Sequence, residues 1–246
     1  MEQNFPIPAV LDTDTFNEID DQFTLAYALL ARNVIDLQAV TAAPFSNSRA
    51  AAPDEGMRKS YEEICRILAL FGKDPEGFAW KGSTGYLPDR RTPVESEGAR
   101  QIIRLARQAG RAGRKLHVLA IAAITNVASA LLLAPEIAKE IVIVWLGGQE
   151  LGYPDNNEFN LRQDVPAAQT VFDSGAPLVW LPCQSVVSAL SITLPELRTG
   201  LAPAGKLGEF TTERLSLHFT FIYLSGKTVI LALCSNKTLM EALLYR

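Results

Sequence analysis

Four aspartates lie within ten residues near the amino terminus of this 246-residue chain, at Asp12, Asp14, Asp20 and Asp21. Carboxylates at this density repel one another, so such a cluster usually holds a cation or contains groups with shifted pKa values. The alternative is a solvated loop in which Asp20 or Asp21 stabilises the start of a helix. Helix capping requires one or two acids rather than four, and the cluster therefore favours a cation site.

The elements around the cluster alternate between short apolar runs and helical patterns. A strand is predicted at residues 7–12 and a helix at about 20–32, so the acidic loop would follow the carboxyl end of a strand. Further strands are predicted near residues 37–41, 78–81, 116–122, 140–146 and 177–181. Further helices are predicted at about 54–71, 97–109, 126–133 and 165–173.

This alternation is typical of a parallel sheet with right-handed crossovers. The predicted strands are nearly all-apolar, which indicates that both faces of the sheet are covered. We therefore predict one α/β domain over residues 1–246, with an open, mostly parallel, Rossmann-like sheet and helices on both faces. In such sheets the ligand binds at the carboxyl ends of the strands.

The composition is that of a folded protein with a small ligand. Apolar residues make up 48% of the chain and charged residues 20%, which argues against disorder, and the net charge of −4 argues against general binding to nucleic acid. Cys65, Cys183 and Cys234 form no C-x-x-C pair, and we interpret them as reduced thiols in the core of a cytoplasmic protein. Neither a secretory signal nor a membrane span is predicted.

The predicted helix at residues 97–109 and the residues after it are rich in arginine. Arg100, Arg104, Arg107 and Arg111 recur at intervals of three or four residues, which places them on one face. Such a face could contact phosphate or nucleic acid. The simpler interpretation is a solvated outer face of the helix.

Polar residues follow three other predicted strands or turns, at Asn47, at Thr125-Asn126 and at Glu158-Phe159-Asn160. In a parallel sheet these residues emerge at the same edge as the four aspartates. Asn126 alone could instead cap the helix that follows it. Together, oxygen ligands without His or Cys suit calcium or magnesium rather than zinc, and they suit a polyhydroxylated ligand.

These motifs together resemble the inosine–uridine-preferring nucleoside hydrolase family, from about residue 7 to about residue 190. The four aspartates are loosely similar to the family's Asp-x-Asp-Pro-Gly-x-Asp-Asp signature, with five residues rather than three between the inner carboxylates and without the Pro-Gly. Later blocks are similar to the family's Thr-Asn block, glycine pair and Glu-Phe-Asn block. They are, in order, Thr125-Asn126, Gly147-Gly148 and Glu158-Phe159-Asn160, followed by Asp164 and Ala167-Ala168.

The resemblance implies a calcium-dependent enzyme of nucleoside salvage that splits a ribonucleoside into ribose and free base. Asp14 would bind calcium and act as general base on the attacking water, with Asp21 as a second calcium ligand and the backbone carbonyl of Thr125 as a third. The implied sugar-binding and loop-ordering residues are Asp20, Asn47, Glu158 and Asn160 for the ribose, and Asp12 for the order of the loop. The ligand would be a small nucleoside, and the protein would bind neither nucleic acid nor membrane.

The carboxyl-terminal part departs from the family pattern. The family carries a late aspartate that completes the calcium shell, and by spacing it should fall near residues 230–236, where this sequence has no acid. An altered or shortened carboxyl terminus would weaken calcium binding, which leaves open a disabled member that binds nucleoside or ribose without turnover. Uncovered apolar surface would also favour a homo-oligomer, a dimer or a tetramer.

One enzyme of another class stays open. An Asp-x-Asp after an apolar strand, here Asp12 and Asp14, also begins the signature of haloacid dehalogenase-type phosphatases. That signature expects Thr or Val two residues after the second aspartate, where this chain has Phe16. The later Glu-Phe-Asn block would then have no role.

Overall fold

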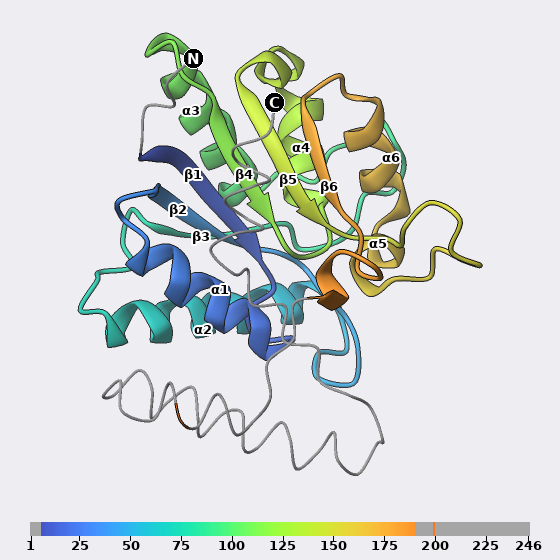
Figure 1. The fold of residues 1–246 in the computed structure, drawn as a ribbon, viewed down its shortest axis with the longest axis horizontal. Helices are drawn as coiled ribbons and strands as arrows, with labels where there is room; N and C mark the ends of the chain where they lie inside the picture. Colours follow the sequence, from blue (N-terminus) through green and yellow to red (C-terminus); the bar gives the residue numbers. More distant parts are fainter. Residues whose placement is uncertain (1–5, 190–198, 200–246) are drawn as a thin grey trace.

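A parallel sheet forms the centre of the protein in this computed structural model, which describes residues 6–189 and residue 199 (Figure 1). Within those residues the sheet has six strands in the order β3-β2-β1-β4-β5-β6, and every neighbouring pair is parallel. The strands are β1 (Ile7–Thr13), β2 (Ile35–Ala42), β3 (Ala79–Lys81), β4 (Leu116–Ala120), β5 (Ile141–Leu146) and β6 (Leu178–Leu181).

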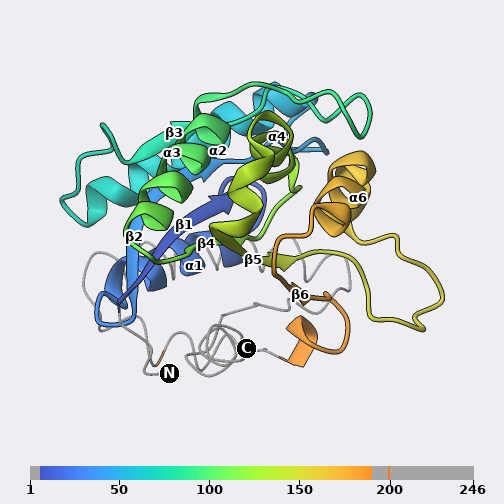
Figure 2. The same ribbon diagram turned by 90° about the horizontal axis from the view of Figure 1, so that it is seen from above.

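Helices connect the strands and cover both faces of the sheet. The helices are α1 (Ile19–Leu30), α2 (Pro53–Leu70), α3 (Glu97–Arg111), α4 (Thr125–Leu133), α5 (Phe159–Gln163) and α6 (Val165–Asp173), with 3₁₀ turns η1 (Pro135–Lys139) and η2 (Val187–Ala189). α3 and α4 lie side by side (Figure 2). None of the helices in the described part combines the length and the apolar character that crossing a membrane requires.

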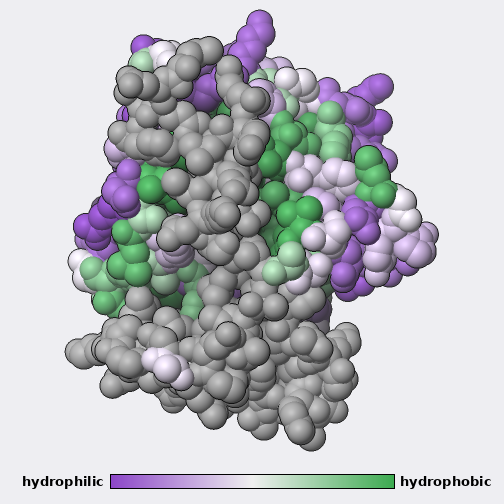
Figure 3. Space-filling view, viewed as in Figure 1, coloured by the Kyte–Doolittle hydropathy of each residue, from purple (hydrophilic) through white to green (hydrophobic). Residues whose placement is uncertain are grey.

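Two apolar cores, one on each face, hold these layers together. Successive strand residues point to opposite faces. Val10 therefore belongs to the core shared with α3, α4 and α6, whereas its neighbour Leu11 belongs to the core shared with α1 and α2. Because burying one such side chain contributes about 1.5–3 kcal/mol, the all-apolar strands stabilise both layers. Apolar residues also reach the surface over β5 and β6 (Figure 3), where all four residues of β6 are only half-buried.

The predicted α/β architecture is confirmed, and the sheet is wholly parallel within the described residues. The sequence prediction missed α5, because its five residues are too few to show a helical period. Two predictions concern residues outside the described part of the chain. They are the reduced core thiol at Cys234 and the lack of the family's late aspartate at residues 230–236.

The strand order places its switch point where the acidic loop lies. The order 3-2-1-4-5-6 reverses between β1 and β4, and ligands of doubly wound sheets bind at this switch point, beyond the carboxyl ends of the strands. β1 leads directly into Asp14 and the acidic loop, and β4 leads into the first turn of α4. The topology therefore brings the residues of the predicted site to one edge.

Candidate functional site

The structure gathers the four aspartates around the end of β1 and the start of α1. Asp12 belongs to β1, Asp14 follows it, and Asp20 and Asp21 lie in the first turn of α1. Asp12, Asp14 and Asp21 are at most 3% exposed, and Asp20 is half-buried. In the described part of the chain, no lysine or arginine forms an ion pair with any of the four.

Burial without a cationic partner shifts the acidity of this cluster. Burial and the neighbouring Glu18 and Asp20 raise the pKa of Asp14 well above its usual value, against a hydrogen bond from Asn17. Burial, Asp14 and Asp20 likewise raise the pKa of Asp21, whose Oδ1 accepts a hydrogen bond from the Thr13 hydroxyl. Burial and Glu18 raise the pKa of Asp20 to about 7. A bound cation would relieve this repulsion.

Asp12 is held in the middle of the sheet by its neighbours. Its Oδ1 accepts hydrogen bonds from Thr41 Oγ1 at 2.6 Å and from Asn126 Nδ2 at 2.8 Å. Its Oδ2 is buried and has no hydrogen-bond partner. Burial raises the pKa of Asp12 to about 6, although the two hydrogen bonds oppose this shift. These contacts fit a residue that orders the loop after β1.

Asn126 ties three segments together and does not cap α4. The capping position is Ile124, which provides no side-chain cap. Besides Asp12, Asn126 Nδ2 donates to the Ala42 carbonyl at 3.2 Å, and Asn126 Oδ1 accepts from the Ser83 amide at 2.7 Å. A Cβ at the adjacent Gly82 would lie 1.9 Å from the Ala42 carbonyl oxygen, so only glycine permits this approach.

Thr125 opens α4 at the same edge of the sheet. Its hydroxyl donates to Asp164 Oδ2 at 2.6 Å, and Asp164 Oδ1 in turn caps α6 by accepting from the Ala167 amide at 3.0 Å. The side chain of Thr125 is therefore committed to Asp164. The predicted use of its backbone carbonyl as a metal ligand stays a prediction.

Glu158 and Asn160 are fixed at the carboxyl ends of β4 and β5. Glu158 accepts hydrogen bonds from the amides of Gly148 at 2.7 Å, Asn160 at 2.9 Å and Leu161 at 2.9 Å, and so caps α5. Asn160 Nδ2 donates to the carbonyls of Ile121 and Leu146, each at 3.1 Å. Both side chains brace the loop that would surround a ligand, and their contact with a sugar stays a prediction.

Cys183 follows β6, and its amide donates to the Gly148 carbonyl at 2.9 Å. Burial, followed by the carboxylates of Glu158, Glu18 and Asp20, raises the pKa of the Cys183 thiol. Cys183 and Cys65 are free and only half-buried. Cys65 packs against the core that the sheet forms with α1 and α2, as predicted, whereas Cys183 belongs to neither core of the described residues.

Asn17 connects Asn47 to Asp14, and sequence reasoning missed it. The exposed Asn47 donates from Nδ2 to Asn17 Oδ1 at 2.7 Å, and the buried Asn17 donates from Nδ2 to Asp14 Oδ2 at 3.0 Å. The structure thus brings Asn47, the loosest of the sequence predictions, to the acidic cluster through one intermediate side chain. The sequence feature that could have identified Asn17 is its position inside the acidic loop.

Gln163 fastens the loop that carries Asn47, and we call its contacts with Ser46 the Gln163 clasp. Gln163 Oε1 accepts from the Ser46 amide at 3.0 Å, and Gln163 Nε2 donates to the Ser46 carbonyl at 3.2 Å. The Tyr86 hydroxyl also contacts Gln163 Oε1, and it lies 3.1 Å from Ser46 Oγ. Sequence reasoning could not find this clasp, because its members come from three distant segments.

The donor set of the acidic cluster fits a hard cation. Asp14 and Asp21 are buried carboxylates that repel each other, and oxygen ligands are those that calcium prefers. Among the described residues, no group of three or more His, Cys, Asp or Glu side chains is arranged to hold a metal. A complete shell would therefore need carbonyl oxygens, water or residues outside the described part.

Comparison with known proteins identifies the family to which the chain is similar. The model of the family described as inosine-uridine preferring nucleoside hydrolase matches residues 9–235. A relative described as probable uridine nucleosidase 2, from Arabidopsis thaliana, is 26% identical over 192 residues, which cover 72% of this chain and 58% of that protein. The chain thus spans less than two thirds of the length of this relative.

Two solved structures share the fold. A purine-preferring ribonucleoside hydrolase from Gardnerella vaginalis has a TM-score of 0.64 at 24% identity, covering 83% of this chain and 69% of that one. An inosine-guanosine nucleoside hydrolase has a TM-score of 0.69 at 19% identity, covering 87% of this chain and 73% of that one. At these identities the likeness shows the architecture alone.

Proposed function

The chain belongs to the inosine-uridine preferring nucleoside hydrolase family, and from this premise we propose that it hydrolyses the N-glycosidic bond of ribonucleosides in a calcium-dependent reaction. The products would be ribose and a free base. The observation that carries the proposal is the acidic cluster at the switch point of the sheet, in which Asp14 and Asp21 are buried together without a cationic partner. Membership of this family also argues against the alternative that the chain is a haloacid dehalogenase-type phosphatase.

The general base of this reaction is Asp14. Asp14 takes a proton from the attacking water while the water oxygen bonds to the anomeric carbon of the ribose. The nucleobase departs with the electrons of the C–N bond. Asn17 holds Asp14 Oδ2 from 3.0 Å away and so orients the carboxylate. Calcium, held by Asp14, Asp21 and the Thr125 carbonyl, would lower the pKa of the attacking water.

The remaining polar residues bind the sugar and the charge that develops on it. Cleavage passes through an oxocarbenium-like ribose, which nearby carboxylates stabilise electrostatically. The ribose hydroxyls exchange hydrogen bonds with four side chains, those of Asp20, Asn47, Glu158 and Asn160. A missing hydroxyl would leave buried acceptors unpaired, so ribonucleosides are favoured over deoxyribonucleosides.

The test is reducing-sugar release from inosine, uridine, adenosine and cytidine, with 2′-deoxyinosine as the specificity arm. Each nucleoside is assayed with calcium and again with excess chelator. We expect turnover of at least one ribonucleoside, lost on chelation and much slower for 2′-deoxyinosine. Turnover that is unchanged by the chelator would contradict the calcium requirement.

A second candidate function is binding of a nucleoside or ribose without turnover. The observation that favours it is the small number of carboxylates available to a metal, since no group of three candidate ligands converges within the described residues. This alternative predicts that folded protein binds ribose in calorimetry and releases no sugar from any nucleoside in the panel.

A further inference from the structure

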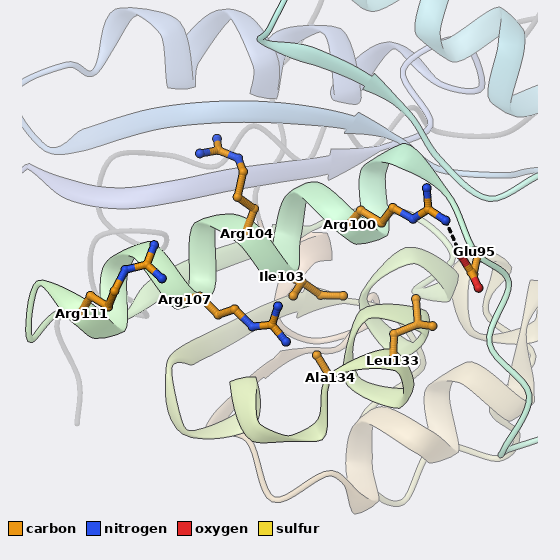
Figure 4. A pocket seen from close by; sticks show the side chains of 8 residues that line it. All are labelled: Glu95, Arg100, Ile103, Arg104, Arg107, Arg111, Leu133 and Ala134. Atoms are coloured by element: carbon orange, nitrogen blue, oxygen red, sulfur yellow. Dashed lines mark hydrogen bonds and ion pairs between the residues drawn. The ribbon is translucent and has the colours of Figure 1, made fainter.

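A pocket of about 500 Å³ lies on the outer side of α3, next to the end of α4 (Figure 4). Its lining combines four arginines with a small apolar surface. The lining residues are Glu95, Arg100, Ile103, Arg104, Arg107, Arg111, Leu133 and Ala134. We call it the arginine pocket. The arginines are exposed, as the sequence predicted, but they surround a hollow rather than an even solvated face.

The arginine pocket carries an excess of positive charge. Arg100 pairs with Glu95, and Arg107 pairs with Glu136 at 2.5 Å. Arg104 donates only to glutamine side chains, and Arg111 forms no ion pair in the described part of the chain. Two guanidinium groups are thus left without a carboxylate, in a protein whose net charge is −4. A local field of this sign attracts anions.

The apolar part of the lining limits the kind of anion. Ile103 and Ala134 are at most 9% exposed, and Leu133 is 36% exposed. Leu133 therefore offers most of the apolar surface to a ligand, while guanidinium groups bind phosphate oxygens in a bidentate manner. The volume lies within the roughly 300–1,000 Å³ of small-molecule sites. A concave site on an acidic protein also fits a small ligand better than a nucleic acid chain.

We propose that the arginine pocket binds a phosphorylated small molecule of nucleotide size, with its phosphate between Arg104 and Arg111 and its apolar group on Leu133. The site is distinct from the acidic cluster. α4 begins at Thr125, beside that cluster, and ends at Leu133, which lines the arginine pocket. Eight helical steps at 1.5 Å each separate the two ends by roughly 12 Å.

The test is calorimetric titration of the full chain with adenosine monophosphate, adenosine and inorganic phosphate. All titrations contain excess ribose, so that a nucleoside site is already occupied. The pocket variant is Arg104→Gln/Arg111→Gln. The matched control is Arg58→Gln/Arg91→Gln, which changes two exposed arginines that form no ion pair in the described chain. Circular dichroism confirms that both variants are folded.

We expect adenosine monophosphate to bind the wild type and the control equally, and to bind the pocket variant at least tenfold more weakly. It should bind more tightly than either adenosine or inorganic phosphate, and its affinity should fall as salt rises. Three results would overturn the proposal: no binding at millimolar concentration, equal affinity for wild type and pocket variant, or adenosine binding as tightly as its monophosphate. The comparison of wild type with the pocket variant leaves the acidic cluster unchanged, so it can fail while the proposed hydrolysis of nucleosides stands.

Discussion

At the scale of single residues, the notable feature is that carboxylates are buried without cations. Asp12, Asp14 and Asp21 are each almost fully buried, yet their partners are hydroxyl and amide groups. Hydrogen bonds of this kind offset only part of the cost of burying a charge. The fold therefore holds an arrangement that is unfavourable by itself, as expected where a ligand supplies the missing charge.

Asp12 allows this cost to be measured without disturbing the proposed metal ligands. Its pKa is about 6 in the folded protein against 3.8 for an ordinary aspartate. The raised pKa means that the folded protein binds the proton more tightly, so wild-type stability falls as pH rises from about 4 through 6. In excess chelator, the free energy of unfolding of wild type should therefore fall relative to Asp12→Asn, by about 1.4 kcal/mol per unit of pKa difference.

Urea denaturation at pH 4.5, 6 and 7.5 measures this difference. The control is Asp89→Asn, because hydrogen bonds from the Arg91 amide and from Thr92 lower the pKa of this exposed aspartate. For Asp89→Asn, the difference in the free energy of unfolding from wild type should change with pH in the opposite direction and by much less. A difference between wild type and Asp12→Asn that stays constant with pH would show that Asp12 keeps an ordinary pKa.

Only part of the site could be predicted at this scale. The aspartates stand out in the sequence because four acids in ten residues need an explanation wherever they lie. Asn17 does not stand out, because a single amide in a polar loop has many possible roles. Its bonds to Asp14 and Asn47 depend on how the loop after β2 folds back.

At the scale of elements, the strands and long helices could be predicted because each carries its own local signal. Strands such as β4 and β5 are short apolar runs bounded by polar turns, and helices such as α3 show a clear 3.6-residue period. α5 has no such period, and its cap, Glu158, was interpreted only as a sugar ligand. The Gln163 clasp joins two residues that are 117 positions apart in the sequence, and local sequence patterns carry no information at that separation.

The Gln163 clasp should control the affinity for the sugar. Gln163→Ala removes both hydrogen bonds to the Ser46 backbone and frees the loop that carries Asn47. We expect KM to rise several-fold with little change in kcat, and stability to fall by about 1–3 kcal/mol. Steady-state kinetics measures the first effect, and hydrogen exchange at the Ser46 amide measures the release of the loop even without an assay of activity.

Tyr86→Phe is the matched control for this experiment. It removes the hydroxyl that contacts Gln163 and Ser46 Oγ but leaves both backbone hydrogen bonds of the clasp intact. KM should therefore stay close to that of wild type. If Gln163→Ala leaves both KM and the exchange of the Ser46 amide unchanged, the clasp does not position the loop.

At the scale of the whole molecule, calcium should act as a stabilising ligand. Binding at 100 times the dissociation constant stabilises the folded state by about 2.7 kcal/mol, which raises the Tm of a domain of this size by roughly 5–10 °C. Because the pKa values of Asp14 and Asp21 are raised, protons compete with calcium at low pH. The increase in Tm should thus be larger at pH 8 than at pH 5.5.

Thermal unfolding with calcium, magnesium and chelator at the two pH values tests this expectation. Magnesium should raise the Tm less than calcium, since it prefers a tighter octahedral shell. An equal Tm with calcium and chelator at pH 8 would contradict a calcium site in the folded protein.

The homo-oligomeric state and the cytoplasmic location stay predictions. Light scattering during size-exclusion chromatography tests the oligomeric state.

The most direct test of the central claim compares wild type with Asp14→Asn for reducing-sugar release from inosine and uridine in calcium. Asp54→Asn, a change of an exposed aspartate in the first turn of α2, is the matched control. We predict that Asp14→Asn lowers kcat by roughly 10²–10⁴-fold, while Asp54→Asn and wild type agree. Equal rates for Asp14→Asn and wild type, or no turnover by folded wild type, would contradict the claim that this acidic cluster hydrolyses ribonucleosides.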